Sequence, residues 1–163
     1  MKKFVKTICC LPILIALTVL ALTPVTAYAS PPTEGSGSYE FGNTTILDVR
    51  QAGGTMIIKD ITEQVLEGDV TGTAIFERTF ILHSNGKFNV HGIVTATAIV
   101  GDRSGTYTQR AVAKGDMTTG TVQGTTVFLS GTGDLANIHG HGTITGVSNV
   151  AGTYSGKIHF DPD

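Results

Sequence analysis

Residues 70–100 read VTGTAIFERTFILHSNGKFNVHGIVTATAIV, and this stretch gives the clearest indication of the fold. Valine, isoleucine, threonine and phenylalanine are frequent on both sides of Asn85-Gly86, and no apolar spacing of helical period runs through the stretch. An Asn-Gly pair between two such runs is a strong signal for a β-hairpin with a two-residue type I′ turn. The sequence therefore predicts two antiparallel strands, Val70–Ser84 and Lys87–Val100.

A two-residue turn also fixes which side chains of the hairpin share a face. Ser84 then pairs with Lys87, and Glu77 with Val94. One face combines aliphatic with small side chains, which suits the narrow interior of a barrel, and we assign it to the interior. Extended across the next turn, this face comprises Ile75, Glu77, Thr79, Ile81, His83, Phe88, Val90, Val94, Ala96, Ala98, Tyr107, Gln109 and Ala111.

The opposite face of the predicted hairpin is apolar as well, and a lone barrel would expose it. Large exposed apolar patches mark sites of association. We therefore expect a homo-oligomer that buries this patch, or a covering by the N-terminal segment. The patch consists of Phe76, Phe80, Leu82 and Ile93.

The chain on both sides of the hairpin has the same β character. Glycine-containing turns separate six further predicted strands, at Asn43–Gln51, Thr55–Glu67, Gly105–Lys114, Thr119–Ser130, His139–Val147 and Gly152–Phe160. Closure of such strands into a ring removes the edges that they would otherwise expose. The sequence predicts an all-β protein in which residues 43–163 form one closed antiparallel barrel of about eight strands.

The N-terminal residues 1–29 have the organisation of a secretory signal peptide. Three lysines within the first six residues precede an apolar run from Ile8 to Leu22, and Ala27-Tyr28-Ala29 provides a cleavage site. We expect an exported protein, secreted or on the periplasmic or cell-envelope exterior, with no membrane attachment after cleavage. An uncleaved membrane anchor is the alternative. Residues 30–42, which begin SPPTEGSG, are predicted to form a flexible tether.

Composition excludes several classes of site from the predicted mature chain. Both cysteines, Cys9 and Cys10, lie in the signal peptide, which leaves no thiol for disulfides, thiolate metal sites or cysteine nucleophiles. The net charge of the whole chain is −2, and the scattered basic residues form no patch for nucleic acid. Motifs for a serine nucleophile or a phosphate-binding loop are absent from the sequence.

Glu77 is the candidate catalytic residue of the predicted interior. Desolvation on an apolar face raises the pKa of a carboxylate and suits it to general acid or base chemistry. The non-catalytic alternative is that Glu77 points outward, or that an internal partner neutralises its charge. The predicted ligand-binding residues that share its cavity are His83, Tyr107, Gln109, Phe88 and Val94.

A second candidate is the stretch SGTGDLANIHGHGTITG, residues 130–146. His139 and His141 share a strand face, but zinc needs a further ligand, and none lies at a recognised spacing. We predict neither a metal nor a cofactor. The structural explanation is a turn in which Asp134 caps one helical turn while Leu135 and Ile138 close a barrel mouth. The predicted turn residues are Gly131, Gly133, Asp134 and Leu135.

Four pieces of the chain carry a resemblance to a known family. They are GDVTGTAIFER (68–78), DRSGTYTQ (102–109), SGTGDLANIHGHGTI (130–144) and GTYSGKIHFD (152–161). From Glu67 to Pro162 the chain resembles the bacterial domain-of-unknown-function family 3224, small domains with an allene-oxide-cyclase-like β-barrel. The resemblance implies a central cavity and frequent oligomers, and it implies no established activity. Gly92-Ile93-Val94 replaces the family's usual Gly-Leu-Glu, so that an interior carboxylate pair is reduced to Glu77.

The sequence as a whole predicts an exported β-barrel, more a binding protein than an enzyme, that holds a small apolar molecule in its cavity. One alternative is an allene-oxide-cyclase-like isomerase or cyclase in which Glu77 moves a proton in a confined site. Another is a non-catalytic interaction module of the cell envelope, with an interior filled by side chains. An exposed Glu77 removes the enzyme mechanism, and a packed interior removes both ligand hypotheses.

Overall fold

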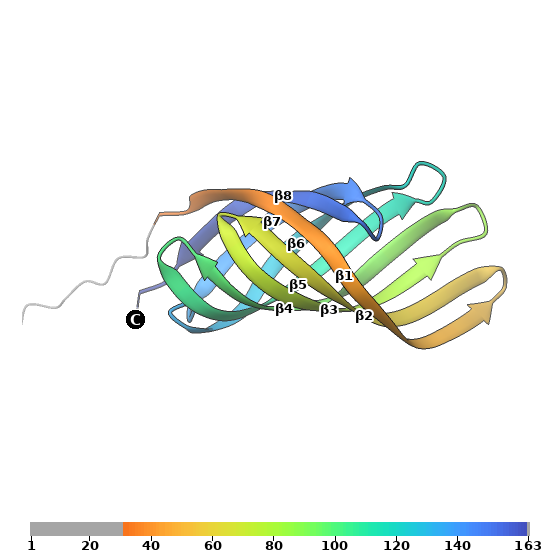
Figure 1. Cartoon of the computed structure of the whole chain (residues 1–163). Helices are drawn as coiled ribbons and strands as arrows, with labels where there is room; N and C mark the ends of the chain where they lie inside the picture. The colour runs from red at the N-terminus through yellow and green to blue at the C-terminus, as the bar shows by residue number, and fades with distance from the viewer. Residues whose placement is uncertain (1–30, 163) are drawn as a thin grey trace, which may run out of the picture.

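The computed structural model describes residues 31–162, and in it eight strands form a closed antiparallel barrel (Figure 1). Each strand pairs with the next along the chain, and β1 pairs with β8 to close the ring. The strands are β1 (Thr33–Ala52), β2 (Thr55–Gly68), β3 (Val70–Leu82), β4 (Lys87–Val100), β5 (Arg103–Asp116), β6 (Thr121–Gly133), β7 (Ile138–Val147) and β8 (Ala151–Phe160). The predicted fold class is confirmed. No helix with the length and apolarity needed to cross a membrane occurs in the described range.

Strand β1 begins well before the predicted start of the barrel. Residues 30–42 were expected to form a tether, but Thr33–Glu40 pairs with β8, and Gly37–Phe41 pairs with β2. This prediction is wrong from Thr33 onward, because small residues such as glycine and serine hide the alternation of a strand that closes a barrel. The predicted signal peptide, residues 1–29, lies outside the described residues.

The turn between β3 and β4 is one residue longer than predicted. The His83 amide donates to the Lys87 carbonyl at 2.9 Å, and the Gly86 amide donates to the His83 carbonyl at 3.0 Å. The loop is therefore Ser84-Asn85-Gly86, with Gly86 in the left-handed region at φ 79°. Three-residue loops of this kind place glycine at that position, so Asn-Gly is compatible with both loop lengths.

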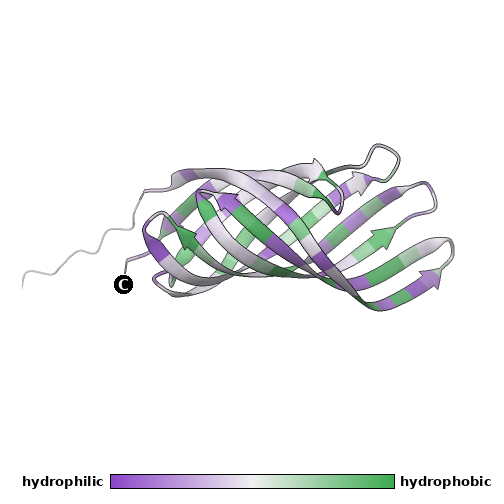
Figure 2. Cartoon of the chain, in the orientation of Figure 1, coloured by the Kyte–Doolittle hydropathy of each residue, from purple (hydrophilic) through white to green (hydrophobic). Residues whose placement is uncertain are grey.

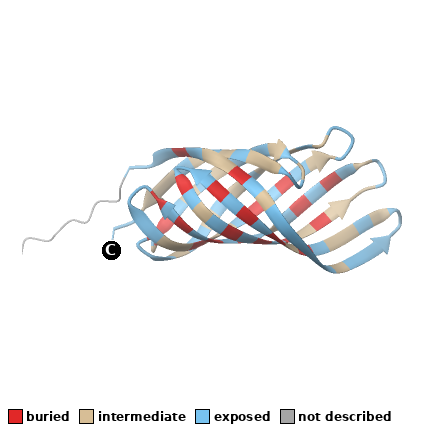
Figure 3. Ribbon diagram, in the orientation of Figure 1, coloured by how far each residue is buried: buried red, intermediate tan, exposed pale blue. Residues whose placement is uncertain are grey.

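This one-residue difference moves every side chain of β3 to the opposite face of the sheet. Phe76, not Glu77, pairs with Val94, and Phe80 pairs with Val90. Glu77 is exposed, so its predicted interior position is wrong. Burial alternates along the barrel strands (Figure 3), and the buried side chains of β3 are Ala74, Phe76, Arg78 and Phe80.

The argument for a homo-oligomer changes with the register. Phe76 and Phe80 were expected on the outer surface, but they are 5% and 6% exposed inside the barrel. Leu82 is half-buried, and only Ile93 of that predicted patch is exposed, at 39%. The homo-oligomer stays a prediction, without the patch that motivated it.

The faces predicted for β4 and β5 agree with the structure. Hydrophobic and hydrophilic residues alternate along these strands (Figure 2). The inner side chains of β4 and β5 that are buried include Phe88, Val90, Val94, Ala96, Ala98, Tyr107 and Ala111. Their alternation with outward threonines and charged residues is regular enough to assign the faces from sequence alone.

Aromatic rings inside the barrel lie against glycines of neighbouring strands. A β-carbon at Gly152 would collide with the Tyr39 ring, and one at Gly115 would collide with the Phe88 ring. Bare backbone at these positions lets large rings fit into the narrow interior. Glycine in a strand here serves packing and not flexibility.

A short turn between β6 and β7 covers the barrel end at which the C-terminus also lies (Figure 1). Leu135 is fully buried, and Ile138 is 1% exposed. Gly133 and Asn137 adopt positive φ angles of 63° and 60°. Asp134 does not cap its own turn: its carboxylate accepts hydrogen bonds from the Ser104 hydroxyl at 3.4 Å and the Ser104 amide at 3.5 Å, and so links the turn to the start of β5.

Candidate functional site

The interior of the barrel contains a cavity of about 100 Å³. A cavity of this size has room for several waters or a small organic molecule. Aliphatic and aromatic side chains form most of its wall, among them Leu66, Phe76, Phe80, Phe88, Val90, Val94, Phe128 and Ile144. The polar side chains of the wall include Tyr39, Gln64, Arg78, Tyr107, Gln109 and Thr126.

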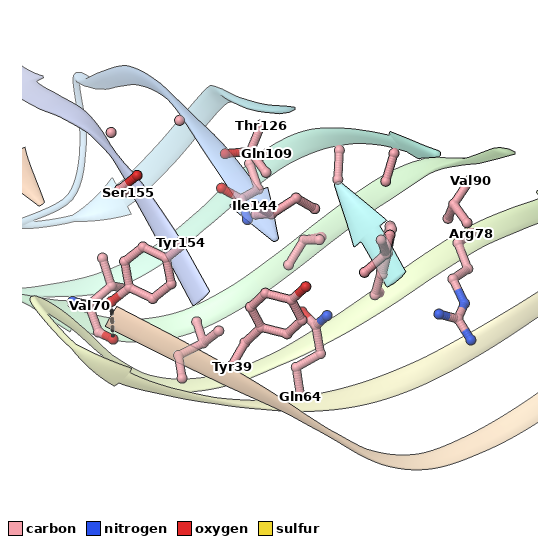
Figure 4. A pocket seen from close by; sticks show the side chains of 18 of the residues that line it. Tyr39, Gln64, Val70, Arg78, Val90, Gln109, Thr126, Ile144, Tyr154 and Ser155 are labelled. Carbon is pink, nitrogen blue, oxygen red and sulfur yellow. Dashed lines mark hydrogen bonds between the residues drawn. The ribbon is translucent and has the colours of Figure 1, made fainter. Parts of the chain in front are cut away.

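Tyr39 on β1 and Gln64 on β2 bring hydrogen-bonding groups to one side of this cavity. Both occupy inward positions of their strands and are 5% and 7% exposed. Figure 4 shows the Tyr39 hydroxyl and the Gln64 amide side by side, with Gln109 and Thr126 on the facing wall. Neither Tyr39 nor Gln64 has a side-chain hydrogen bond to another residue of the described chain.

A buried ion pair lies between β2 and β3. Asp60 and Arg78 occupy paired positions, and Arg78 Nε lies 2.6 Å from Asp60 Oδ1. Their side chains are only 6% and 5% exposed. The Arg78 guanidinium also lies 5.3 Å from the Phe41 ring centroid and 5.8 Å from that of Phe76. These contacts neutralise and support a charge that would be costly to bury alone.

Sequence reasoning missed this ion pair because of the β3 register. With the two-residue loop, Arg78 points outward and has no reason to meet Asp60. The signal was nevertheless present: β2 carries Asp60, Thr62 and Gln64 at alternate positions, on the same face as Ile58 and Leu66. Their burial shows that this polar row faces inward, with the Thr62 hydroxyl donating to Asp60 Oδ1 at 3.5 Å.

The tyrosines of the barrel interior stay protonated at neutral pH. Burial raises the pKa of Tyr39, and burial together with the neighbouring Tyr154 raises the pKa of Tyr107. Burial also raises the pKa of Tyr154, whose hydroxyl accepts a hydrogen bond from the Val70 amide at 2.9 Å. The cavity therefore presents neutral phenols, which donate and accept hydrogen bonds without adding charge.

The predicted ligand-binding residues divide into two groups. Four of them line the cavity: Phe88, Val94, Tyr107 and Gln109. The fifth, His83, lies at the end of the β3–β4 hairpin, where its Nε2 is 3.1 Å from Asn89 Nδ2. Glu77 on the outer face cannot reach a molecule inside the barrel, so the proposed proton transfer by Glu77 has no structural support. Binding by the four lining residues stays a prediction.

The two histidines of the 130–146 stretch lie on the outer surface. His139 stacks on His159 of β8 with a centroid separation of 5.4 Å, and His139 Nε2 is 3.1 Å from Asp161 Oδ2. His141 pairs instead with Lys157. Across residues 31–162, no group of three or more histidine, cysteine, aspartate or glutamate side chains has an arrangement that would hold a metal ion.

Comparison with known proteins places the barrel in a family. The family model for proteins of unknown function named DUF3224 matches residues 35–157. The chain belongs to the DUF3224 family. The match starts earlier than the resemblance seen in the sequence, and it reaches into all eight strands, β1 included.

A solved structure of a DUF3224 protein has the same fold. It is the crystal structure of a protein of unknown function from Shewanella oneidensis MR-1, which is similar to this chain with a TM-score of 0.63 and 16% sequence identity. The alignment covers 82% of this chain and 100% of the other. No curated protein matches the sequence. At this sequence identity the similarity shows the barrel fold alone, and the function has to be inferred from the residues of the site.

Proposed function

We propose that this DUF3224 protein is exported and binds a slender, mainly apolar small molecule inside its barrel. The observation that carries the proposal is the cavity of about 100 Å³ whose wall is mostly aliphatic and aromatic. Small-molecule sites are commonly concave and apolar, with a few placed polar groups. Tyr39, Gln64 and Gln109 are such groups here.

Small residues on the inner face support this function over an interior packed with side chains. Ala111 of β5, Gly142 of β7 and Gly156 of β8 all line the cavity. Larger side chains at inward positions would reduce the space, as happens in barrels whose interior is completely filled. The wall formed by β7 and β8 is partly bare backbone.

Native mass spectrometry with a cavity-filling variant tests the proposal. The protein is purified from its host without detergent or organic solvent, and we expect a retained molecule that is released on denaturation. Ala111→Leu adds bulk to the cavity wall and should reduce the retained fraction. Val112→Leu is the matched control, because Val112 follows Ala111 on the same strand but is 48% exposed.

Val94→Leu provides a second, milder filling variant in case Ala111→Leu folds poorly. Val94 is 3% exposed and lines the same cavity. Retention unchanged in both folded filling variants, or no binding of any apolar probe by the wild-type protein, would contradict the proposal.

Export has its own test in the mass of the mature protein. We expect the protein recovered from outside the cytoplasm to begin at Ser30, because Ala27-Tyr28-Ala29 is a cleavage signal that directly precedes the Ala29–Ser30 bond. Intact-mass measurement or N-terminal sequencing checks this. A protein that retains residues 1–29 and stays with the membrane fraction would support the anchor alternative.

A further inference from the structure

The side-chain amide of Gln64 has the environment of a ligand-binding group. Gln64 is 7% exposed and forms no side-chain hydrogen bond to the described chain. Every fully enclosed side-chain nitrogen or oxygen in residues 31–162 has a hydrogen-bond partner, so the unpaired Gln64 atoms must border the cavity. An amide that faces a cavity without a protein partner is available to form hydrogen bonds with a molecule held there.

The Tyr39 hydroxyl lies beside this amide and has the same property. It points into the cavity in Figure 4, is not hydrogen-bonded to another described residue, and belongs to a side chain that is 5% exposed. Burial raises the Tyr39 pKa, which keeps the hydroxyl neutral. The amide and the phenol together offer donors and acceptors to one small polar group.

The charge inside the barrel is already balanced. Arg78 is the cationic side chain that is buried among the described residues, and its Nε lies 2.6 Å from Asp60 Oδ1. A carboxylate ligand would add a net negative charge to this interior, because the charge of Arg78 is already paired with that of Asp60. Burial of an unpaired charge is far more costly than burial of a neutral polar group.

We propose that the molecule held in the barrel is uncharged and carries one hydrogen-bonding group, such as an alcohol or a ketone, that binds to Gln64 and Tyr39. This inference rests on the proposed ligand-binding function and narrows its ligand class. Leu66 and Phe76 are among the apolar side chains that receive the hydrocarbon part of the ligand. Fatty acids and other carboxylates should bind more weakly than neutral ligands of the same size.

Titrations followed by NMR test this preference with three four-carbon probes that suit the size of the cavity: 1-butanol, 2-butanone and butanoate at neutral pH. We expect the two neutral probes to bind at least about tenfold more tightly than butanoate. Gln64→Leu should weaken 1-butanol binding by about tenfold while the barrel stays folded. Gln123→Leu is the matched control, because Gln123 is exposed on the outer face of β6. Tyr39→Phe removes only the hydroxyl and should weaken binding as well.

The outcomes separate this inference from the function on which it rests. Butanoate binding as tight as 1-butanol binding would overturn the inference, and so would unchanged 1-butanol affinity in both Gln64→Leu and Tyr39→Phe. In either case the cavity would still bind ligands, so the proposed function would stand. If none of the three probes binds the wild-type protein, the proposed function fails and this inference fails with it.

Discussion

At the scale of single residues, the Asp60–Arg78 ion pair is the feature whose disruption should affect stability most, because both charges are buried. Both side chains are about 95% removed from solvent, with Nε and Oδ1 2.6 Å apart. A buried pair of this kind adds little net stability compared with apolar residues of similar volume. Loss of one partner is different, because it leaves the other charge buried and unpaired.

Asp60→Asn should therefore destabilise the protein by about 3–5 kcal/mol. Urea unfolding measures the change, with Asp48→Asn as the control. Asp48 lies 2.7 Å from Arg50 on the surface, where the side chains are 39% and 70% exposed, and loss of that pair should cost less than about 1 kcal/mol. The double variant Asp60→Leu/Arg78→Met should recover much of the stability lost in Asp60→Asn. Equal destabilisation by Asp60→Asn and Asp48→Asn would contradict the prediction.

The buried tyrosines predict how stability changes at alkaline pH. The pKa of Tyr107 is raised above that of an unfolded tyrosine, which is about 10, mainly because the folded barrel buries the phenol. The stability that the neutral phenol contributes is fully present below about pH 10 and is lost as the pH rises through the raised pKa. Free energies of unfolding measured between pH 8 and 11 should fall above about pH 10. Tyr107→Phe should reduce that fall, and an identical slope in both proteins would contradict the prediction.

At the scale of elements, the turn between β6 and β7 shows how one short segment stabilises a barrel end. Leu135 is completely buried there, although it lies in a turn. A β-carbon at Gly131 would collide with the Leu135 carbonyl, so the turn and the strand before it are packed in direct contact. Overpacking at such a position is destabilising.

Leu135→Ala should destabilise the protein by about 2–5 kcal/mol, because it leaves a cavity under the turn. The matched control is Leu129→Ala on β6, where the leucine is 51% exposed and the change should stay within about 0.5 kcal/mol. Thermal or urea unfolding measures both. Similar losses for the two leucines would show that Leu135 does not anchor this end of the barrel.

The β3–β4 hairpin shows which structural features could be predicted from the sequence and which could not. The strands themselves are readable from β-branched residues, and the faces of β4 follow from regular alternation between apolar and polar positions. Strand β3 lacks that contrast, because Ile75 and Ile81 on one face compete with Phe76 and Phe80 on the other. Only the loop length then sets the register, and Asn85-Gly86 fits two lengths. Glu77 was consequently predicted to face the interior and Arg78 the outside, whereas the structure has them the other way round.

At the scale of the whole molecule, closure of the ring depends on a strand that composition conceals. Thr33–Glu40 is rich in small and polar residues, yet it pairs with β8 and so closes the ring. The number of strands, their order and the part of the apolar cavity wall formed by β4 and β5 were predictable from alternation and turns. Tyr107 and Gln109 of the polar wall were predicted as well. Tyr39 and Gln64 were not, because Tyr39 lies in the stretch assigned to a tether and Gln64 in a polar row of β2 that became interpretable only with the register known.

The most direct test of ligand binding inside the barrel is an NMR titration of the methyl-labelled protein with 1-butanol. Inner and outer methyl groups alternate along the same strands: Val94 and Ala111 line the cavity, whereas Ile93 and Val112 are exposed on the outer face. We predict saturable chemical-shift changes at Val94 and Ala111, with Ile93 and Val112 unaffected. Shifts confined to the outer methyls, or no saturable shift at the inner ones, would contradict ligand binding inside the barrel.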